Sequence, residues 1–369
     1  MESNSPPVYG GTPPLIQPPP AHRRMRAGRG WMVLALVLAA VLGLVGAREF
    51  ARWLLPPGGL GGSGVAGHSM DEVTIENNRS ENKIAVVGLE GIITSQMWDG
   101  GGRNMVDLIS EQLKMAGRDK SVKAVILKVD SPGGEVMASD DISRAISEFQ
   151  EKHGKPAVAF LSGLAASGGY YVAVPCQWIV ASELTITGSI GVIMHSFNYR
   201  GLLDKVGLHP QVFKSGKFKD MLSGSRKLDE VDPKEGEMIQ SMIDETYSRF
   251  KKVVETGRRS AQDKNKGNGR ALVENWQQYA DGRVLTGLQA YDYGFVDETG
   301  NFETAVKRAK NIAQIDGANL VRYVEPFSLA RVFGFLGKKE STALKLDLGL
   351  EFPKLQAGRL YFLSSTVLH

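Results

Sequence analysis

The sequence contains very little that binds metal ions or forms disulfides. Its 369 residues include a single cysteine, Cys176, so no disulfide can form within the chain. The six histidines and this cysteine form no CxxC pair, no HExxH motif and no other spacing typical of a zinc site. We therefore expect neither a metal ion nor a cofactor. Cys176 lies among apolar residues, and we interpret it as a small core residue.

Signals for nucleotide and nucleic-acid binding are also missing. The chain has no GxxxxGK[ST] phosphate loop, and no GxGxxG opens a predicted helix. The net charge is only +4, and most of it lies in the segment 1–30, where four arginines accompany one glutamate. The rest of the chain is nearly neutral, so we expect no nucleic-acid partner.

The N-terminal part of the chain, from 1 to 82, differs in composition from the rest. Residues 1–30 are rich in proline and end in a basic cluster, as expected for a disordered cytoplasmic tail. Residues 31–47, WMVLALVLAAVLGLVGA, carry no charge and predict a transmembrane anchor. Residues 48–82 contain the glycine-rich stretch PPGGLGGSGVAG, which is typical of a flexible tether.

The charges around the apolar segment predict its orientation. Arginines are denser before residue 31 than after residue 47, which places the N-terminus in the cytoplasm and the chain after residue 48 outside it. A cleaved signal peptide is the alternative, because Val45-Gly46-Ala47 resembles a cleavage site. The leader that precedes the apolar segment is long for a signal peptide, which favours a single-pass membrane anchor.

Strand and helix patterns alternate after the tether. Asp232-Pro233 opens a long amphipathic helix, and another helix is expected from about 301 to 313. This alternation predicts an α/β fold with a largely parallel sheet covered by helices. The apolar runs that read as strands are 83–94, 122–129, 156–163, 178–182 and 211–216.

Two regions complete the expected organisation. Residues 83–337 form one predicted domain, and residues 338–369 form a C-terminal extension. Within the extension, LKLDLGLEFPKL alternates apolar and polar residues from 344 to 355. This alternation indicates a strand or a surface-docking arm.

The stretch LSGLAASGGYYVA, residues 161–173, places one hydroxyl among four small residues. A predicted strand leads into Ser167 and an apolar helix follows it. Free N–H groups at a helix N-terminus favour a developing oxyanion, and small neighbours let a peptide backbone approach closely. The local sequence therefore supports either a nucleophilic serine or an ordinary helix-capping serine.

A second glycine turn favours the nucleophile. Residues 131–134, Ser-Pro-Gly-Gly, follow the predicted strand at 122–129. Glycine N–H groups in such a turn can point at a carbonyl oxygen, and sites in parallel sheets gather at the carboxyl ends of strands. The two turns together predict an oxyanion-binding site, and an ordinary strand-to-helix turn is the alternative.

A serine needs a base to act as a nucleophile. No histidine has a convincing acidic partner nearby in sequence, and no GxSxG elbow surrounds Ser167. A lysine can replace histidine when burial lowers its pKa from about 10.4 toward neutrality. Lys214, Lys217 and Lys219 lie in or just after the predicted strand at 211–216, and their spacing alone does not distinguish among them.

Six segments, taken together and in order, carry a family resemblance. They are IAVVGLEGII, VDSPGGEV, LAASGGYYVA, ITGSIGVI, KSGKFKDMLS and VLTGLQAYDYGFVDE. In this combination the chain resembles the bacterial signal peptide peptidase A family over about residues 83–325. The SPGG segment alone is less specific, because Clp-type proteases and crotonase-fold enzymes share it.

The resemblance implies a Clp protease/crotonase-like fold and a Ser-Lys dyad. Ser167 would be the nucleophile and Lys219 its general base, with Ser189 orienting the lysine amine. The backbone N–H groups of Gly134 and Gly168 would form the oxyanion hole.

The implied activity is that of a membrane-anchored serine endopeptidase that degrades cleaved signal peptides. The resemblance also implies a homo-oligomer, in which a neighbouring chain completes each site. A related Clp-class membrane protease acting on membrane proteins would use the same dyad. A catalytically inactive peptide-binding scaffold, or a crotonase-type acyl-CoA enzyme, would need neither Ser167 nor Lys219.

Overall fold

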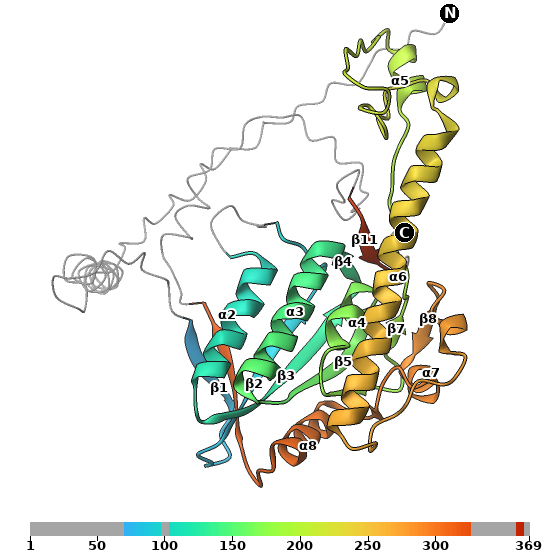
Figure 1. Cartoon of the computed structure of the whole chain (residues 1–369). Helices are drawn as coiled ribbons and strands as arrows, with labels where there is room; N and C mark the ends of the chain where they lie inside the picture. The colour runs from blue at the N-terminus through green and yellow to red at the C-terminus, as the bar shows by residue number, and fades with distance from the viewer. Residues whose placement is uncertain (1–69, 97–102, 326–358, 365–369) are drawn as a thin grey trace, which may run out of the picture. The chain divides into compact units, whose positions relative to one another are not determined.

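The computed structural model describes residues 70–96, 103–325 and 359–364 (Figure 1). The predicted tail and anchor, residues 1–47, lie outside the described residues, as do residues 48–69 of the predicted tether. Residues 338–358 of the predicted extension also lie outside them. In the described ranges, no helix is long and apolar enough to cross a membrane.

A largely parallel sheet forms the centre of the described chain. Its strand order is β1-β10-β2-β3-β5-β6-β9, and β7 pairs with both β5 and β8. Only β1 and β8 pair with their neighbours in antiparallel fashion within this described sheet. The strands are β1 Asp71–Glu76, β2 Lys83–Glu90, β3 Val122–Ser131, β4 Gly133–Glu135, β5 Ala157–Ala166, β6 Trp178–Ala181, β7 Ile186–Gly188, β8 Val284–Thr286, β9 Glu298–Thr299, β10 Asn319–Val324 and β11 Tyr361–Leu363.

Helices pack on both faces of this sheet, as the sequence predicts. Side chains of β2 alternate between the two layers: Ala85 and Val87 pack with α2, α3 and α4, whereas Ile84 packs with α8. The α/β fold class is therefore confirmed. The helices are α2 Met105–Arg118, α3 Val136–His153, α4 Gly168–Ala173, α5 Arg200–Lys205, α6 Pro233–Lys264, α7 Gly287–Asp292 and α8 Phe302–Ala313, with short 3-10 turns η1 Leu228–Glu230 and η2 Trp276–Tyr279.

The long helix α6 begins where the sequence predicts. Asp232 caps it in a reciprocal arrangement with Glu235. Its C-terminal half is anchored to the body of the fold, because Arg258 and Asp297 form a fully buried ion pair at 2.6 Å. Phe250 and Val254 are fully buried on the same side of the helix. This half of α6 therefore has a fixed position over α4.

Three segments differ from the sequence interpretation. Residues 211–216 form no strand, and Val212 and Phe213 are exposed there. Residues 71–76, within the predicted tether, form β1 and pair with β10. β11 lies within the predicted C-terminal extension and pairs with β4, far away in the sequence. The strands β1 and β11 depend on pairing between distant segments, which a local pattern does not reveal.

Candidate active site

Ser167 lies at the junction of β5 and α4. Its backbone has φ 53° and ψ −116°, a conformation that residues with a Cβ rarely adopt. Its N–H donates to the carbonyl of Gly188 at 2.8 Å, which holds the turn in place. Ser167 occupies the N-cap position of α4, but its buried side chain makes no capping hydrogen bond to that helix. Its Oγ has no hydrogen-bond partner in the part of the chain that the structure describes.

The predicted oxyanion glycines lie against each other. A Cβ placed on Gly168 would be 3.1 Å from the backbone N of Gly134. A Cβ placed on Gly133 would be 2.6 Å from the backbone N of Gly168. Gly133 also has a φ of 100°, a conformation that favours glycine. The two turns predicted separately thus meet at one point, with Ser167 directly before Gly168.

A strand from the C-terminal segment runs along the glycine turn. β11 pairs antiparallel with β4, and Phe362 lies opposite Gly134. On the other edge of β11, Tyr361 exchanges two backbone hydrogen bonds with Ile193, at 3.0 and 3.1 Å. The space between β4 and Ile193, which we call the groove, therefore holds an extended segment by main-chain bonds on both sides. Such bonds bind a peptide backbone independently of its sequence.

The side chain of Phe362 fills an aromatic pocket beside the serine. Its ring centroid lies 4.9 Å from that of Tyr171 on α4 and 4.7 Å from that of Phe250 on α6. The hydroxyl of Tyr171 donates to Asp140 on α3 at 2.6 Å, which fixes the ring. The pocket therefore accepts a bulky apolar side chain next to Ser167.

Ser189 lies close to Ser167 through strand pairing. β7 runs parallel to β5, and Gly188 pairs with Ala166. Ser189 therefore follows the residue whose carbonyl binds the Ser167 N–H. It is buried, has a φ of 50°, and donates its own N–H to the carbonyl of Arg283 at 2.7 Å. Its role toward a lysine stays a prediction.

Lys219 is not bonded to Ser167 within the described chain. It is exposed and lies in residues 194–232, which we call the lysine segment. Arg226 ties this segment to the start of α6, because its guanidinium pairs with Asp220 at 3.2 Å and with Glu235 at 3.0 Å. The segment therefore lies at the N-terminal end of α6 (Figure 1).

Helix geometry shows how far this end is from the serine. A helix rises ~1.5 Å per residue, so Glu235 lies about 22 Å along α6 from Phe250. Phe250 is where α6 contacts Tyr171 of α4, with ring centroids 4.9 Å apart. The part of α6 that touches the site is thus remote from the part that holds the lysine segment.

The lysine segment carries an unusual amount of exposed apolar surface. More than half of the large apolar side chains that are exposed in the described ranges belong to it. Apolar patches of this kind are typical of protein–protein contacts. The residues are Phe197, Tyr199, Leu202, Val206, Leu208, Val212, Phe213, Leu228 and Val231.

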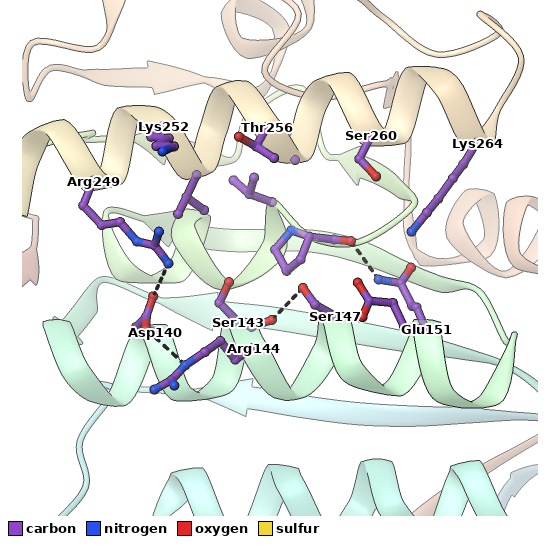
Figure 2. A pocket seen from close by; sticks show the side chains of 15 residues that line it. Asp140, Ser143, Arg144, Ser147, Glu151, Arg249, Lys252, Thr256, Ser260 and Lys264 are labelled. Atoms are coloured by element: carbon purple, nitrogen blue, oxygen red, sulfur yellow. Dashed lines mark hydrogen bonds and ion pairs between the residues drawn. The ribbon is translucent and has the colours of Figure 1, made fainter.

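A cavity of about 270 Å³ lies between α3 and α6 (Figure 2), and Ser167 is not among the residues that line it. Its walls are charged, and Arg144 and Arg249 both pair with Asp140, at 3.2 and 3.7 Å. Asp140 also accepts the Tyr171 hydrogen bond. We therefore interpret this cavity as the gap between two helices that support the aromatic pocket.

Glu135 follows the oxyanion glycine and is the functional candidate that the sequence interpretation missed. Its side chain is buried, and its carboxylate accepts hydrogen bonds from Thr94 at 3.0 Å and Ser95 at 2.8 Å. Burial alone would raise the pKa of Glu135, but these hydrogen bonds and the charge of Arg359 outweigh it and lower that pKa. The carboxylate therefore stays charged, at the edge of the groove.

Comparisons with known proteins show the family to which the chain is similar. Residues 149–316, which include Ser167 and Lys219, match the model of peptidase family S49. The chain is 35% identical to a protein named as signal peptide peptidase SppA in Enterococcus faecium, over 69% of this chain and 71% of that protein. It is 38% identical to a protein named as protease slr0021 in Synechocystis sp., over 64% of this chain and 76% of that protein.

The chain belongs to peptidase family S49. Protease 4 of Haemophilus influenzae is also similar, at 34% identity over 64% of this chain and 36% of that protein. Among solved structures, a K138A mutant of 1510-N membrane-bound stomatin-specific protease covers 69% of this chain with a TM-score of 0.37 and 16% identity. The family supports a serine peptidase activity for this chain, and the assignment of Ser167 as its nucleophile stays a prediction.

Proposed function

We propose that this S49 peptidase is a membrane-anchored endopeptidase that degrades cleaved signal peptides with a Ser-Lys dyad. The observation that carries the proposal is the buried Ser167 hydroxyl, which has no partner in the described chain and lies beside the paired glycines. The groove and its aromatic pocket suit an extended apolar peptide. We also propose a Clp protease/crotonase-like fold for this domain, in which the turn after β3 forms part of the oxyanion hole.

The base in this proposal is Lys219 of a neighbouring copy. Support comes from the exposure of Lys219, its distance from Ser167 along α6, and the apolar surface of the lysine segment. Burial of that surface against a second copy would also remove the lysine amine from water. Desolvation lowers the pKa of an amine, which is what a general base at neutral pH requires. The proposed assembly is therefore a homo-oligomer with shared sites.

The chemistry follows from these positions. Neutral Lys219 takes the proton of Ser167 Oγ as that oxygen attacks the scissile carbonyl carbon. The N–H groups of Gly134 and Gly168 bind the oxyanion, and loss of one such donor typically slows the reaction about 100- to 1,000-fold. The lysine then gives its proton to the leaving amine. Water, deprotonated by the same lysine, hydrolyses the acyl-enzyme ester and restores the serine.

The location of the peptidase is a further part of the proposal. Residues 31–47 would anchor the chain in the cytoplasmic membrane, with the N-terminus inside and the S49 domain outside. Support comes from the uncharged segment and the basic cluster before it. An enzyme held there meets signal peptides where they remain after release from secreted proteins.

The proposal is tested with the full chain purified in detergent. Cleavage of an unstructured signal peptide is followed by mass spectrometry for the wild type, Ser167→Ala, Lys219→Ala and the matched control Lys217→Ala. We expect cleavage by the wild type and the control only. Cleavage by Ser167→Ala would disprove the nucleophile, and equal activity of Lys219→Ala would disprove the base. If only an intact membrane protein were cut, the related membrane-protease function would replace this one.

A further inference from the structure

The strand β11 lies in the groove in the register of a peptide about to be cleaved. A scissile carbonyl must face Ser167 and the oxyanion glycines. Phe362 lies opposite Gly134, and a Cβ placed on Gly133 would collide with the carbonyl oxygen of Phe362. That same Cβ position is 2.6 Å from the N of Gly168. The carbonyl of Phe362 is therefore the one presented to the site.

Backbone bonds on either side of Phe362 fix this register. Before it, the N–H of Val136 donates to the carbonyl of Leu360 at 3.3 Å. After it, the N–H of Ser364 donates to the carbonyl of Pro132 at 2.9 Å. A bound peptide that follows the same path places each side chain in a defined position along β4.

Arg359 lies at the start of this segment, three residues before Phe362. Its Nη1 donates to Oε1 of Glu135 at 2.9 Å. The side chain of Arg359 is 44% exposed, whereas that of Glu135 is 7% exposed. The carboxylate is thus a fixed part of the groove wall, and the arginine reaches it from the occupying strand.

The surroundings of Glu135 make this carboxylate ready to bind a cation. Thr94 donates to Oε1, and the N–H and hydroxyl of Ser95 donate to Oε2. These neutral donors orient the carboxylate but leave its charge uncompensated. A buried charge is costly without an opposite charge. If β11 left the groove, Glu135 would lose the cation that pairs with it in the described ranges, and another basic side chain could take the place of Arg359.

We infer that Glu135 is a specificity-determining residue, which selects peptides with arginine or lysine three residues before the residue whose carbonyl is attacked. The inference rests on the proposed peptidase function of Ser167. The preferred substrate combines this basic residue with a bulky apolar residue in the pocket of Tyr171 and Phe250. A single N–H···O bond at the carboxylate is enough for either base, so arginine and lysine both satisfy the site.

The test uses the full chain in detergent and two peptides built on the sequence around Phe362. One has arginine at the position of Arg359, and the other has citrulline, which has nearly the same shape without the charge. For the wild type we expect a kcat/KM about tenfold higher for the arginine peptide, because a half-exposed charge pair is weakened by solvent. The difference should lie in KM rather than kcat, since this side chain is far from the scissile bond.

Glu135→Gln removes the charge and keeps an oxygen that accepts from Ser95 or Thr94. We expect this variant to cleave the two peptides at nearly equal rates, whereas the exposed control Glu148→Gln should keep the wild-type ratio. Equal kcat/KM values for the two peptides with the wild-type enzyme would overturn the inference. A parallel fall for both peptides in Glu135→Gln, with the ratio kept, would assign Glu135 a structural role only.

A binding measurement separates this inference from the proposed function. Fluorescence polarisation measures how tightly the labelled peptides bind to Ser167→Ala and to the double variant Ser167→Ala/Glu135→Gln. This measurement requires no cleavage. Competition from β11 affects both peptides alike, so it leaves their ratio unchanged. If the wild type cut neither peptide, the peptidase proposal would fail. The arginine preference in binding would still decide the role of Glu135.

Discussion

Ser167 holds a backbone conformation that costs free energy for any residue with a Cβ. Its φ of 53° and ψ of −116° persist because the Gly188 carbonyl and the packing of α4 hold the turn. The buried hydroxyl also gains no hydrogen bond from the described chain. Both features reduce stability, and we expect them to serve the chemistry, because they leave Oγ unbonded and available to attack a peptide carbonyl.

Because of this strain, we expect glycine at position 167 to give a more stable protein than the serine that activity requires. Ser167→Gly should abolish cleavage and raise the free energy of unfolding by about 1 kcal/mol. Glycine relieves backbone strain of about 1–3 kcal/mol, and its greater conformational entropy in the unfolded chain offsets part of this gain. Ser167→Ala keeps the Cβ and should be less stable than Ser167→Gly. Denaturant unfolding followed by tryptophan fluorescence compares them, and a glycine variant less stable than alanine would contradict the prediction.

Glu135 also gives a prediction on pH. Its pKa lies below the usual value of 4.5, so the carboxylate is charged throughout the neutral range. Arg359 is the charged group that faces it. Preference for the arginine peptide in binding to Ser167→Ala should therefore be constant from pH 8 to about 5 and be lost only as the pH falls through the lowered pKa. Loss of the preference between pH 7 and 5 would contradict this assignment.

At the scale of elements, we expect β11 and a substrate peptide to compete for one groove. Phe362 is fully buried between Tyr171 and Phe250, and its aromatic side chain contributes much of the strand's binding. Phe362→Ala should weaken β11 and raise kcat/KM for a signal peptide about tenfold or more, because burial of such a side chain contributes about 1.5–3 kcal/mol.

The control for this prediction is Leu184→Ala, which changes a side chain that is 87% exposed. Peptide cleavage by both variants is measured at equal enzyme concentration in detergent. The control should match the wild type. Unchanged cleavage by Phe362→Ala would show that β11 leaves the groove too easily to compete.

The sequence predicted the elements whose signals are local. Strand runs and glycine turns placed Ser167 and Gly134 at strand ends, and parallel pairing then brought them together. The sequence did not predict β11, because the run Tyr361–Leu363 is short and forms a strand by pairing with β4, which lies far earlier in the chain. It predicted a strand at Val212 and Phe213, but these apolar side chains face outward and belong to no strand of the described sheet.

At the scale of the whole molecule, the separation of Ser167 from Lys219 predicts complementation between inactive chains. Ser167→Ala retains the lysine segment, and Lys219→Ala retains the serine. Co-expressed in equal amounts, they should recover about one quarter of wild-type activity, because random assembly joins an intact serine to an intact lysine at one site in four. Each variant alone should be inactive. No activity from the mixture, with oligomers confirmed by light scattering, would place both residues in one chain.

The placement of β11 has a practical consequence for handling the protein. Ser364 is buried, and its N–H donates to the carbonyl of Pro132 beside the groove, so the chain is still held at the groove directly after β11. An affinity tag or fluorescent protein inserted within about five residues after Ser364 stays within about 18 Å of it, next to the peptide entrance, because an extended chain spans at most about 3.6 Å per residue. Such a fusion would displace β11 or obstruct the groove, and its cleavage rates would therefore differ from those of the unlabelled enzyme.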